Sequence, residues 1–509
     1  MTNRKRFYTN GILLTAVGIT MRTVSLFFNA FLSRIIGAEG LGLYTVVMTV
    51  YAFAVTFATS GISLTVTRLV ASAIGEKKEG EVSKILVGSV IYALLFSFVA
   101  SAVLFFGAGA FAHYVLDDPR GAVALRILSP SLIPLALVSV FSGYFVGIRR
   151  VACNALTQIL GQLFKILITV FLVLKLSGLG VEYSAIALSL GTTLTEILSF
   201  LVIFLQFLID RRGKSAKRGL DINSVARTAL PLAFSAYIRQ ALLTVEHILI
   251  PKRLKVRGDN TAEALASYGV LHGMALPLIL YPMATLTSFS GLLVPEFAER
   301  DAAGQKESIK KLASEAFSKT LVYAVATSVF LYLFSEELGY VIYDSYPAGM
   351  YIAVLASVVP IMYLDHVTDS VLKGMGEQVY SMWVNITDSL LSIVLVWVLI
   401  PKMGIMGYAL CIIIMEGYNF ILSLLRLLSR VKFRISIVRS IVIPAIAALI
   451  SAVLSKVAFD AGGALPTPYQ LIIKIIFALS AFFVFYKISD VIYSLFVGKF
   501  RMKTVKKAE

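Results

Sequence analysis

The sequence is poor in charged residues. Only 15% of its 509 residues are Asp, Glu, Lys or Arg, while 58% are hydrophobic. Typical globular chains carry about 25% charged residues. A chain with so little charge must hide most of its surface in lipid. The composition excludes a string of soluble domains and predicts a membrane protein.

Cysteine and long hydrophilic connections are also scarce. The two cysteines, Cys153 and Cys411, both fall in apolar stretches. They provide neither a disulfide framework nor a clustered thiolate metal site. No connection between apolar runs exceeds roughly 25 residues, which is too short for an ordinary catalytic or nucleotide-binding domain outside the membrane.

What the sequence does contain is a series of apolar runs of about 20 residues, the length of a membrane-spanning helix. They must be helical, because unpaired backbone groups in hydrocarbon cost several kcal/mol each. The predicted fold class is an all-α polytopic membrane protein with about 14 transmembrane helices. The predicted spans are 10–32, 42–64, 85–109, 122–148, 152–174, 184–208, 228–250, 263–290, 318–335, 351–372, 379–400, 407–428, 439–459 and 470–494.

Positive charge is unevenly distributed between the spans. The chain carries 46 Lys and Arg against 29 Asp and Glu. Most of these bases lie in the set of connections that includes both termini, so the positive-inside rule predicts that both termini are cytoplasmic. The connection 251–262 departs from the rule, because it carries four bases on the side of the membrane opposite the cytoplasm. The excess of Lys and Arg is explained by membrane topology. We therefore expect no nucleic-acid partner.

The chain shows signs of an internal duplication. A proline is followed by a glycine at nearly the same spacing in the fourth and tenth spans, from Pro134 to Gly147 and from Pro360 to Gly374. Both copies run in the same direction, and parallel repeats of this kind place a substrate site at their interface. The predicted organisation is an N-terminal lobe at 1–208, a basic cytoplasmic linker at 209–227, a C-terminal lobe at 228–428, and two further helices with a basic tail at 429–509.

Five stretches carry a resemblance to a known family. They are RIIGAEGLGLYTVVMTVY (34–51), LTVTRLVASAIGEKK (64–78), SPSLIPLALVSVFSGYFVG (129–147), LIPKRL (249–254) and GVLHGMALPLILYPMATLTSFSGLLVPEFAE (269–299). The chain resembles the stage V sporulation protein B group of polysaccharide transporters, within the multidrug/oligosaccharidyl-lipid/polysaccharide exporter superfamily. One departure is Ser142–Gly147, where relatives often have an RGYFQG-like turn. Any role of that Arg and Gln cannot be transferred to this chain.

The resemblance implies two six-helix lobes around a central cavity, followed by two extra helices. It implies alternating access that moves a lipid-linked sugar precursor, such as the peptidoglycan precursor lipid II, across the bacterial plasma membrane. We expect no cofactor and no enzymatic activity. The expected partners are the lipid-linked saccharide, membrane lipid and the cell-wall synthesis machinery, and we expect a monomer.

Cations inside apolar spans are costly and are usually functional. Arg22, Lys165 and Arg239 lie deep within the first, fifth and seventh spans. Because guanidinium and ammonium groups bind phosphate oxygens, we predict that they bind the diphosphate of the lipid carrier. The alternative is that each pairs with a central acid such as Glu196, Asp388 or Glu416.

The acids of the second half suggest ion coupling. Asn385 and Asp388 supply oxygen ligands that alkali cations prefer, and with Glu246 they are candidates for a sodium or proton site. Asp365, Asp369 and Lys373 recur every four residues and share one helix face. They form either a polar lining or, as we favour, a charge network within the helix.

Two other functions remain in view. A sodium- or proton-coupled multidrug exporter of the same superfamily typically needs a carboxylate on its first span, and 10–32 has none. A membrane-embedded glycosyl polymerase or ligase usually carries a large outer loop, and the longest outer connections here are about a dozen residues. A flippase for a lipid-linked saccharide fits the residues best.

Overall fold

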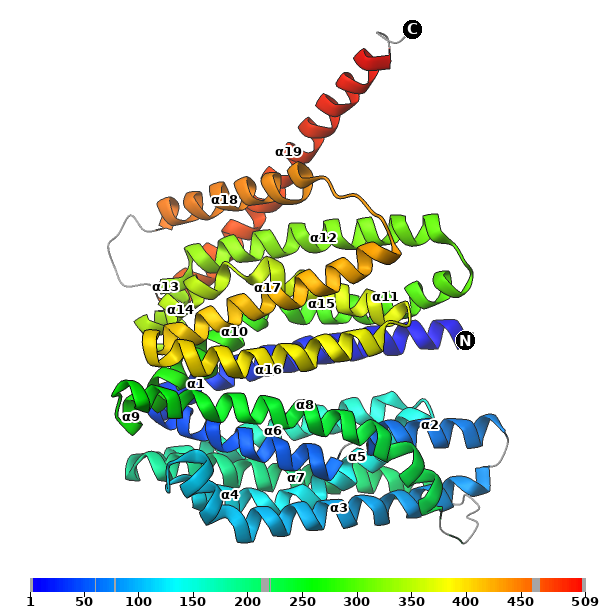
Figure 1. Ribbon diagram of the computed structural model, residues 1–509, viewed down its shortest axis with the longest axis vertical. Helices are drawn as coiled ribbons and strands as arrows, with labels where there is room; N and C mark the ends of the chain where they lie inside the picture. The colour runs from blue at the N-terminus through cyan, green and yellow to red at the C-terminus, as the bar shows by residue number, and fades with distance from the viewer. Residues whose placement is uncertain are drawn as a thin grey trace. The chain divides into compact units, whose positions relative to one another are not determined.

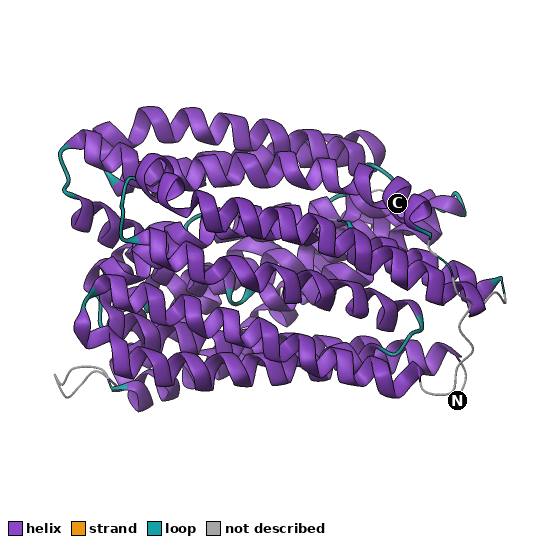
Figure 2. Cartoon of the chain, turned by 90° about the horizontal axis from the view of Figure 1, so that it is seen from below, coloured by secondary structure: helices purple, strands orange, loops and turns teal. Residues whose placement is uncertain are grey.

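The computed structural model describes residues 3–59, 61–76, 79–211, 219, 221–459 and 467–505. Within these ranges every regular element is a helix (Figures 1 and 2). Most of the predicted basic linker, residues 212–218 and 220, lies outside the described part. The all-helical fold class is confirmed.

The helices divide into two compact units. Unit 1 comprises residues 1–273 and 389–408, and unit 2 comprises 274–388 and 409–509. The division passes through two long helices, α16 (Gln378–Met403) and α17 (Ile405–Arg430). It does not coincide with the linker at 209–227, so the lobe boundaries remain predictions.

Unit 1 holds the first nine α-helices, the C-terminal half of α16 and the first four residues of α17. Their bounds are α1 Asn3–Thr59, α2 Ile62–Gly75, α3 Val82–Ala110, α4 Gly121–Leu128, α5 Leu132–Gly147, α6 Val151–Leu176, α7 Val181–Arg211, α8 Ile222–Arg257, α9 Thr261–Tyr268 and α16 Gln378–Met403. Short 3₁₀ or π segments are η1 Glu79–Glu81, η2 Phe111–Leu116, η3 Ser129–Ser131, η4 Ser177–Leu179 and η5 Gly269–Ala275.

Unit 2 holds the remaining helices and the N-terminal half of α16. They are α10 Leu276–Leu280, α11 Met283–Ala302, α12 Lys306–Leu333, α13 Ser335–Tyr343, α14 Tyr346–Ala356, α15 Val359–Gly374, α17 Ile405–Arg430, η6 Val438–Val442, α18 Ile443–Phe459 and α19 Pro468–Val505. Within unit 2, Glu337 of α13 contacts two lysines of the last two helices, Lys456 at 3.7 Å and Lys474 at 3.5 Å. These ion pairs attach α18 and α19 to the rest of the unit.

Eleven helical stretches in the described residues are long and apolar enough to cross a membrane, or twelve if the bent pair α14 and α15 is one span. The predicted count of about fourteen is not confirmed. One stretch, Thr20–Ile74, is 55 residues long and covers two predicted spans. At 1.5 Å per residue it is more than twice as long as the roughly 30 Å hydrocarbon core, and Gly37 interrupts it with a non-helical conformation (φ 71°, ψ 175°).

Two other differences from the prediction have local causes. Helix α8 contains the predicted seventh span, but Arg239, Gln240 and two prolines interrupt its apolar run, and it is not among the eleven. The predicted tenth span is bent by 57° between α14 and α15, next to Pro360. Proline removes a backbone hydrogen bond, which explains a bend at this point.

The two proline–glycine copies have equivalent packing in their own units. In unit 1, a Cβ on Gly147 of α5 would lie 3.0 Å from the Val70 side chain and 3.1 Å from the carbonyl oxygen of Thr67, both in α2. In unit 2, a Cβ on Gly374 of α15 would lie 2.7 Å from the carbonyl oxygen of Val294 in α11. In both copies glycine allows a close approach between two helices of the same unit, and the repeat itself stays a prediction.

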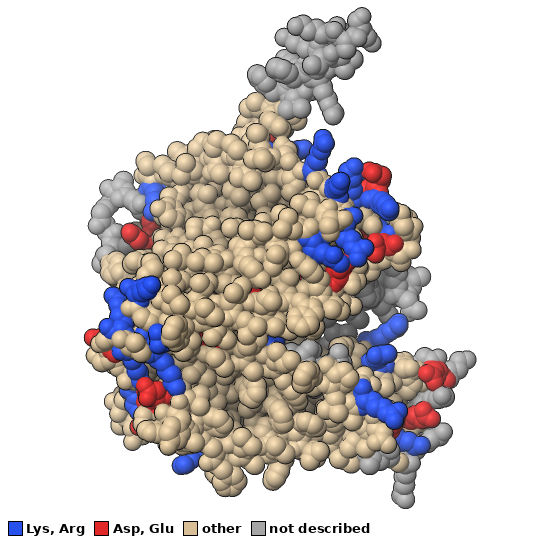
Figure 3. All heavy atoms as spheres, in the orientation of Figure 1, with Lys and Arg blue, Asp and Glu red and all other residues tan. Residues whose placement is uncertain are grey.

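Most of the charged side chains at the surface lie toward the helix ends. On the face in Figure 3, most Lys, Arg, Asp and Glu side chains gather toward the helix ends, and the surface between them is almost entirely uncharged. Large apolar side chains are exposed on the candidate spans, for example Phe106 on α3 and Leu167 on α6. This is the distribution expected of helices that span a bilayer.

Candidate functional site

Two of the three predicted cations lie on neighbouring helices of unit 1. Arg22 is an exposed residue of α1, and Lys165 is a partly buried residue of α6. The Gln162 amide donates a 3.2 Å hydrogen bond to the Ser25 hydroxyl. Since Ser25 is about one turn from Arg22, and Gln162 about one turn from Lys165, this bond fixes the two cation-bearing segments against each other.

Lys165 also has an acidic neighbour. Glu196 of α7 lies close enough to Lys165 for the two charges to attract. This proximity corresponds to one of the two alternatives that the sequence left open for Lys165, although no ion pair between the two residues is formed within 4.0 Å in the described part of the chain. For Arg22, the contact with a diphosphate stays a prediction.

Arg239, the third predicted cation, is an exposed residue of α8 in unit 1. Two residues earlier, Tyr237 stacks on Phe57 of α1 with ring centres 5.3 Å apart, and its hydroxyl donates to the Phe57 carbonyl at 3.3 Å. These contacts hold this part of α8 on α1, the helix that also carries Arg22.

The predicted ion-coupling residues are distributed over both units. Glu246 of α8 is buried in unit 1 and accepts a 2.6 Å hydrogen bond from the Ser392 hydroxyl of α16. Asp388 lies one turn before Ser392 on α16, but it belongs to unit 2. Asn385, also in unit 2, donates its amide to the Ser381 carbonyl at 2.7 Å.

Within unit 2, three carboxyl groups lie near one another. Glu416 of α17 is close enough to Asp365 of α15 and Asp388 of α16 for their charges to interact. Ser423, also on α17, lies next to Asp365. Three acids on three spanning helices can exchange protons or attract a cation, although the described residues include no His, Cys, Asp and Glu group arranged to hold a metal ion.

The remaining members of the α15 stripe form an ion pair. Lys373 Nζ lies 2.5 Å from Asp369 Oδ2, one turn away on the same helix. Asp365, one turn before Asp369, lies close enough to Glu416, Asp369 and Lys373 for their charges to interact. The stripe therefore combines an internal ion pair with an acid directed to neighbouring helices.

Sequence reasoning missed one cluster. His247 of α8 and His272 of η5 have ring centres 4.6 Å apart, and Tyr268 lies beside both, with its hydroxyl 3.2 Å from Nδ1 of His247. Nothing in the sequence indicates that these residues lie together. A π-helical segment carries His272 next to α8, and no apolar pattern signals that arrangement.

Comparisons with known proteins agree with the fold and with the resemblance. The profile described as polysaccharide biosynthesis protein matches residues 7–300, and the MatE profile matches residues 258–398. Stage V sporulation protein B of Bacillus subtilis (strain 168) is 26% identical over 420 residues, covering 81% of each chain. Sporulation protein YkvU of the same organism is 20% identical over 405 residues, covering 77% of this chain and 88% of its own.

Two solved structures have the same fold. The lipid II flippase MurJ in an inward closed conformation has a TM-score of 0.74 and 15% identity, covering 96% of this chain and 100% of its own. An inward-facing multidrug resistance MATE family transporter has a TM-score of 0.68 and 14% identity, covering 82% of this chain and 98% of its own. The chain is a multi-pass membrane protein of the polysaccharide biosynthesis protein family, in the multidrug/oligosaccharidyl-lipid/polysaccharide exporter superfamily of transporters.

Proposed function

We propose that this protein is a flippase that moves an isoprenoid-diphosphate-linked saccharide across the plasma membrane by alternating access, without covalent chemistry. The observation that carries the proposal is the pair of cations on α1 and α6, Arg22 and Lys165, which the Ser25–Gln162 hydrogen bond holds on adjoining segments. Family membership and similarity to a lipid II flippase support the same class of cargo.

The cations match the part of the substrate that hydrocarbon excludes most strongly. A diphosphate carries negative charge that must be compensated away from water. Arginine offers several donors in a planar fork that fits phosphate oxygens, and a low dielectric strengthens the contact. Arg22 would bind the diphosphate, with Lys165 and Arg239 as further contacts. The isoprenoid tail would remain in lipid, since it is apolar.

Coupling to an ion gradient would give the transport of the lipid-linked saccharide a direction. We propose Asn385, Asp388 and Glu246 as the sodium- or proton-sensitive residues, with the neighbouring acids Asp365 and Glu416 in the same network. No cofactor is needed. The site of action is the bacterial inner membrane, with both termini in the cytoplasm. The translocated lipid-linked saccharide would pass to cell-wall synthesis enzymes.

The test is translocation of fluorescent lipid II by purified protein in proteoliposomes. Wild type should flip the lipid, and Arg22→Ala should lose most of this activity while its helical content and elution volume stay unchanged. Arg149→Ala, an exposed arginine in the turn after α5, is the matched control and should remain active. Full activity of Arg22→Ala would refute the diphosphate contact.

One specific observation favours a second function, a multidrug exporter coupled to sodium or protons. The MatE profile matches residues 258–398, which contain Asp365 and Asp388. Cation-driven efflux of a cationic dye from proteoliposomes would support it. The absence of a carboxylate on the first predicted span argues against it.

A further inference from the structure

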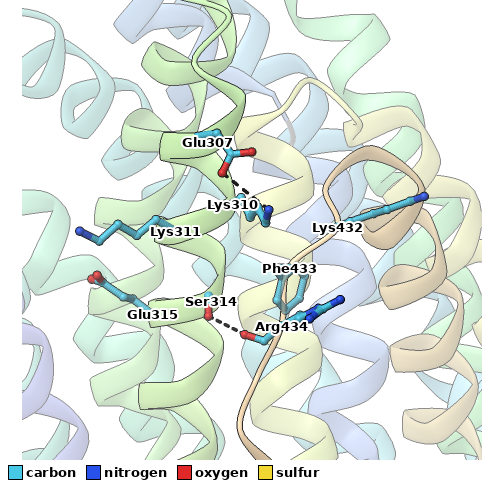
Figure 4. Close-up of a pocket in the computed structure, with 8 residues that line it drawn as sticks. All are labelled: Glu307, Lys310, Lys311, Ser314, Glu315, Lys432, Phe433 and Arg434. Carbon is cyan, nitrogen blue, oxygen red and sulfur yellow. Dashed lines mark hydrogen bonds and ion pairs between the residues drawn. The ribbon is translucent and has the colours of Figure 1, made fainter. Parts of the chain in front are cut away.

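A pocket of about 640 Å³ lies at one end of unit 2, apart from the residues discussed above. Its walls are the first turns of α12 and the connection between α17 and η6 (Figure 4). Both elements belong to the same unit, so the shape of the pocket is set by contacts within that unit.

The pocket carries excess positive charge. Four of its residues are basic (Lys310, Lys311, Lys432 and Arg434) and two are acidic (Glu307 and Glu315). Glu307 lies 3.6 Å from Lys310, and Glu315 is drawn beside Lys311 on the outer side of α12 in Figure 4. The connection contributes two bases and no acid to the pocket, so an anion would be attracted to this wall.

The connection is anchored rather than loosely placed. The Ser314 hydroxyl of α12 donates a 2.7 Å hydrogen bond to the Arg434 carbonyl. The ring of Phe433 packs on Phe317 of α12 with centres 4.7 Å apart. These two contacts fix the backbone between Lys432 and Arg434, whose side chains remain exposed.

The pocket lies at the ends of candidate membrane-spanning helices, which is the level of the lipid headgroups. Helix α17 is a candidate span that ends at Arg430, and the connection follows directly. Helix α12 is also a candidate span, and its charged residues occupy its first turns, before its apolar part. Immediately after the connection, large apolar side chains are exposed on Ile437, Val438, Ile441 and Val442.

We propose that this pocket binds the headgroup of an anionic phospholipid, with phosphatidylglycerol as the chemical class, and that the acyl chains lie along the exposed apolar side chains at 437–442. Basic pockets beside spanning helices bind acidic headgroups through such charges. Arg434 provides a planar fork for phosphate oxygens and Lys432 a second charge. The inference does not depend on the identity of the transported substrate.

The experiment compares lipid binding to the full-length protein in detergent by native mass spectrometry. The probes are phosphatidylglycerol, phosphatidylcholine with identical acyl chains, and soluble glycerol 3-phosphate. Wild type should retain phosphatidylglycerol at least about tenfold more strongly than phosphatidylcholine, since each nearby base adds roughly a fivefold preference. Glycerol 3-phosphate should bind weakly because it lacks acyl chains.

The test variant is Lys432→Gln with Arg434→Gln, which removes two charges from exposed positions and keeps the Ser314 bond to the backbone. It should lose most of the preference for phosphatidylglycerol, about tenfold or more. The matched control, Arg149→Gln with Lys402→Gln, removes the same charge from exposed positions outside the pocket and should bind like wild type. An unchanged preference in the pocket variant, or equal binding of both phospholipids by wild type, would overturn the proposal. Binding of glycerol 3-phosphate as strong as that of the lipid would also overturn it, since the pocket would then be a plain phosphate site.

Discussion

The Gln162 amide nitrogen lies 3.2 Å from the Ser25 hydroxyl oxygen, and this hydrogen bond joins α6 to α1 about one turn from Lys165 and Arg22. A hydrogen bond between two apolar helices stabilises their packing in the membrane, and so it holds the segments that carry the two cations next to each other.

Gln162→Ala should therefore reduce substrate translocation without abolishing it. A hydrogen bond of this kind contributes about 1 kcal/mol, so we expect a several-fold lower rate at low lipid II concentration, measured in proteoliposomes. The control is Gln158→Ala, an exposed position of the same helix. Equal effects of both substitutions would show that the Ser25 contact has no positioning role.

Gly42→Ala tests the packing of α1 on α9. A Cβ at Gly42 would lie 1.9 Å from the Leu265 carbonyl oxygen, so the two helices would have to separate. We expect a loss of roughly 1–3 kcal/mol in the free energy of unfolding, as for other overpacked positions, seen as a lower melting temperature in detergent. Gly417→Ala, where a Cβ meets nothing within 4 Å, should melt like wild type or slightly higher. A melting temperature of Gly42→Ala equal to that of wild type would contradict this packing.

Glu377 gives a pH dependence that can be assigned to one residue. It lies in the turn between α15 and α16, where hydrogen bonds from Arg426, and then from Arg430, hold the pKa of its carboxyl below the usual value. A carboxyl with a lowered pKa in the folded state stabilises the protein above its unfolded pKa of about 4.3. This stabilisation is lost as the pH falls below that value and through the lower folded pKa.

The melting temperature of wild type should thus fall more steeply than that of Glu377→Gln as the pH decreases from about 5 to 3. The two proteins should approach each other at the acidic end, because protonated Glu377 and glutamine are both neutral. Curves that keep a constant separation over this range would exclude Glu377 as the source.

Asp388→Asn tests ion coupling. If Asp388 binds the driving cation, the substitution should make lipid translocation insensitive to imposed sodium and proton gradients, while gradient-free exchange continues. Asp301→Asn, an exposed acid at the end of α11, should retain the response of wild type. Wild-type transport that is unaffected when all ion gradients are collapsed would rule out this role for Asp388.

Much of the fold could be predicted from sequence because long apolar runs leave a helix as the single way to satisfy the backbone in lipid. The number of spans could not, since Gly37 interrupts one continuous helical stretch rather than ending it, and since Arg239 and two prolines dilute the apolar character of α8. The apolar pattern marks helices and does not mark where their boundaries or bends fall.

The sequence identifies single candidate site residues but not which of them lie together in the fold. A cation such as Lys165 in an apolar span is visible in the sequence, but its proximity to Glu196 depends on the packing of α6 against α7. The approach of Glu416 to Asp365 and Asp388 likewise requires three helices to be side by side. Such contacts depend on helix rotation, which a sequence pattern constrains only loosely.

The most direct test of the central claim is lipid II translocation by wild type, Arg22→Ala and Arg149→Ala in the same proteoliposome preparation. The proposal predicts rapid translocation by wild type and Arg149→Ala, and a loss of at least about tenfold in Arg22→Ala, as expected when a charged contact to phosphate is removed. Folded wild-type protein that moves no lipid II would contradict lipid II as the cargo, and full activity of Arg22→Ala would contradict the diphosphate contact.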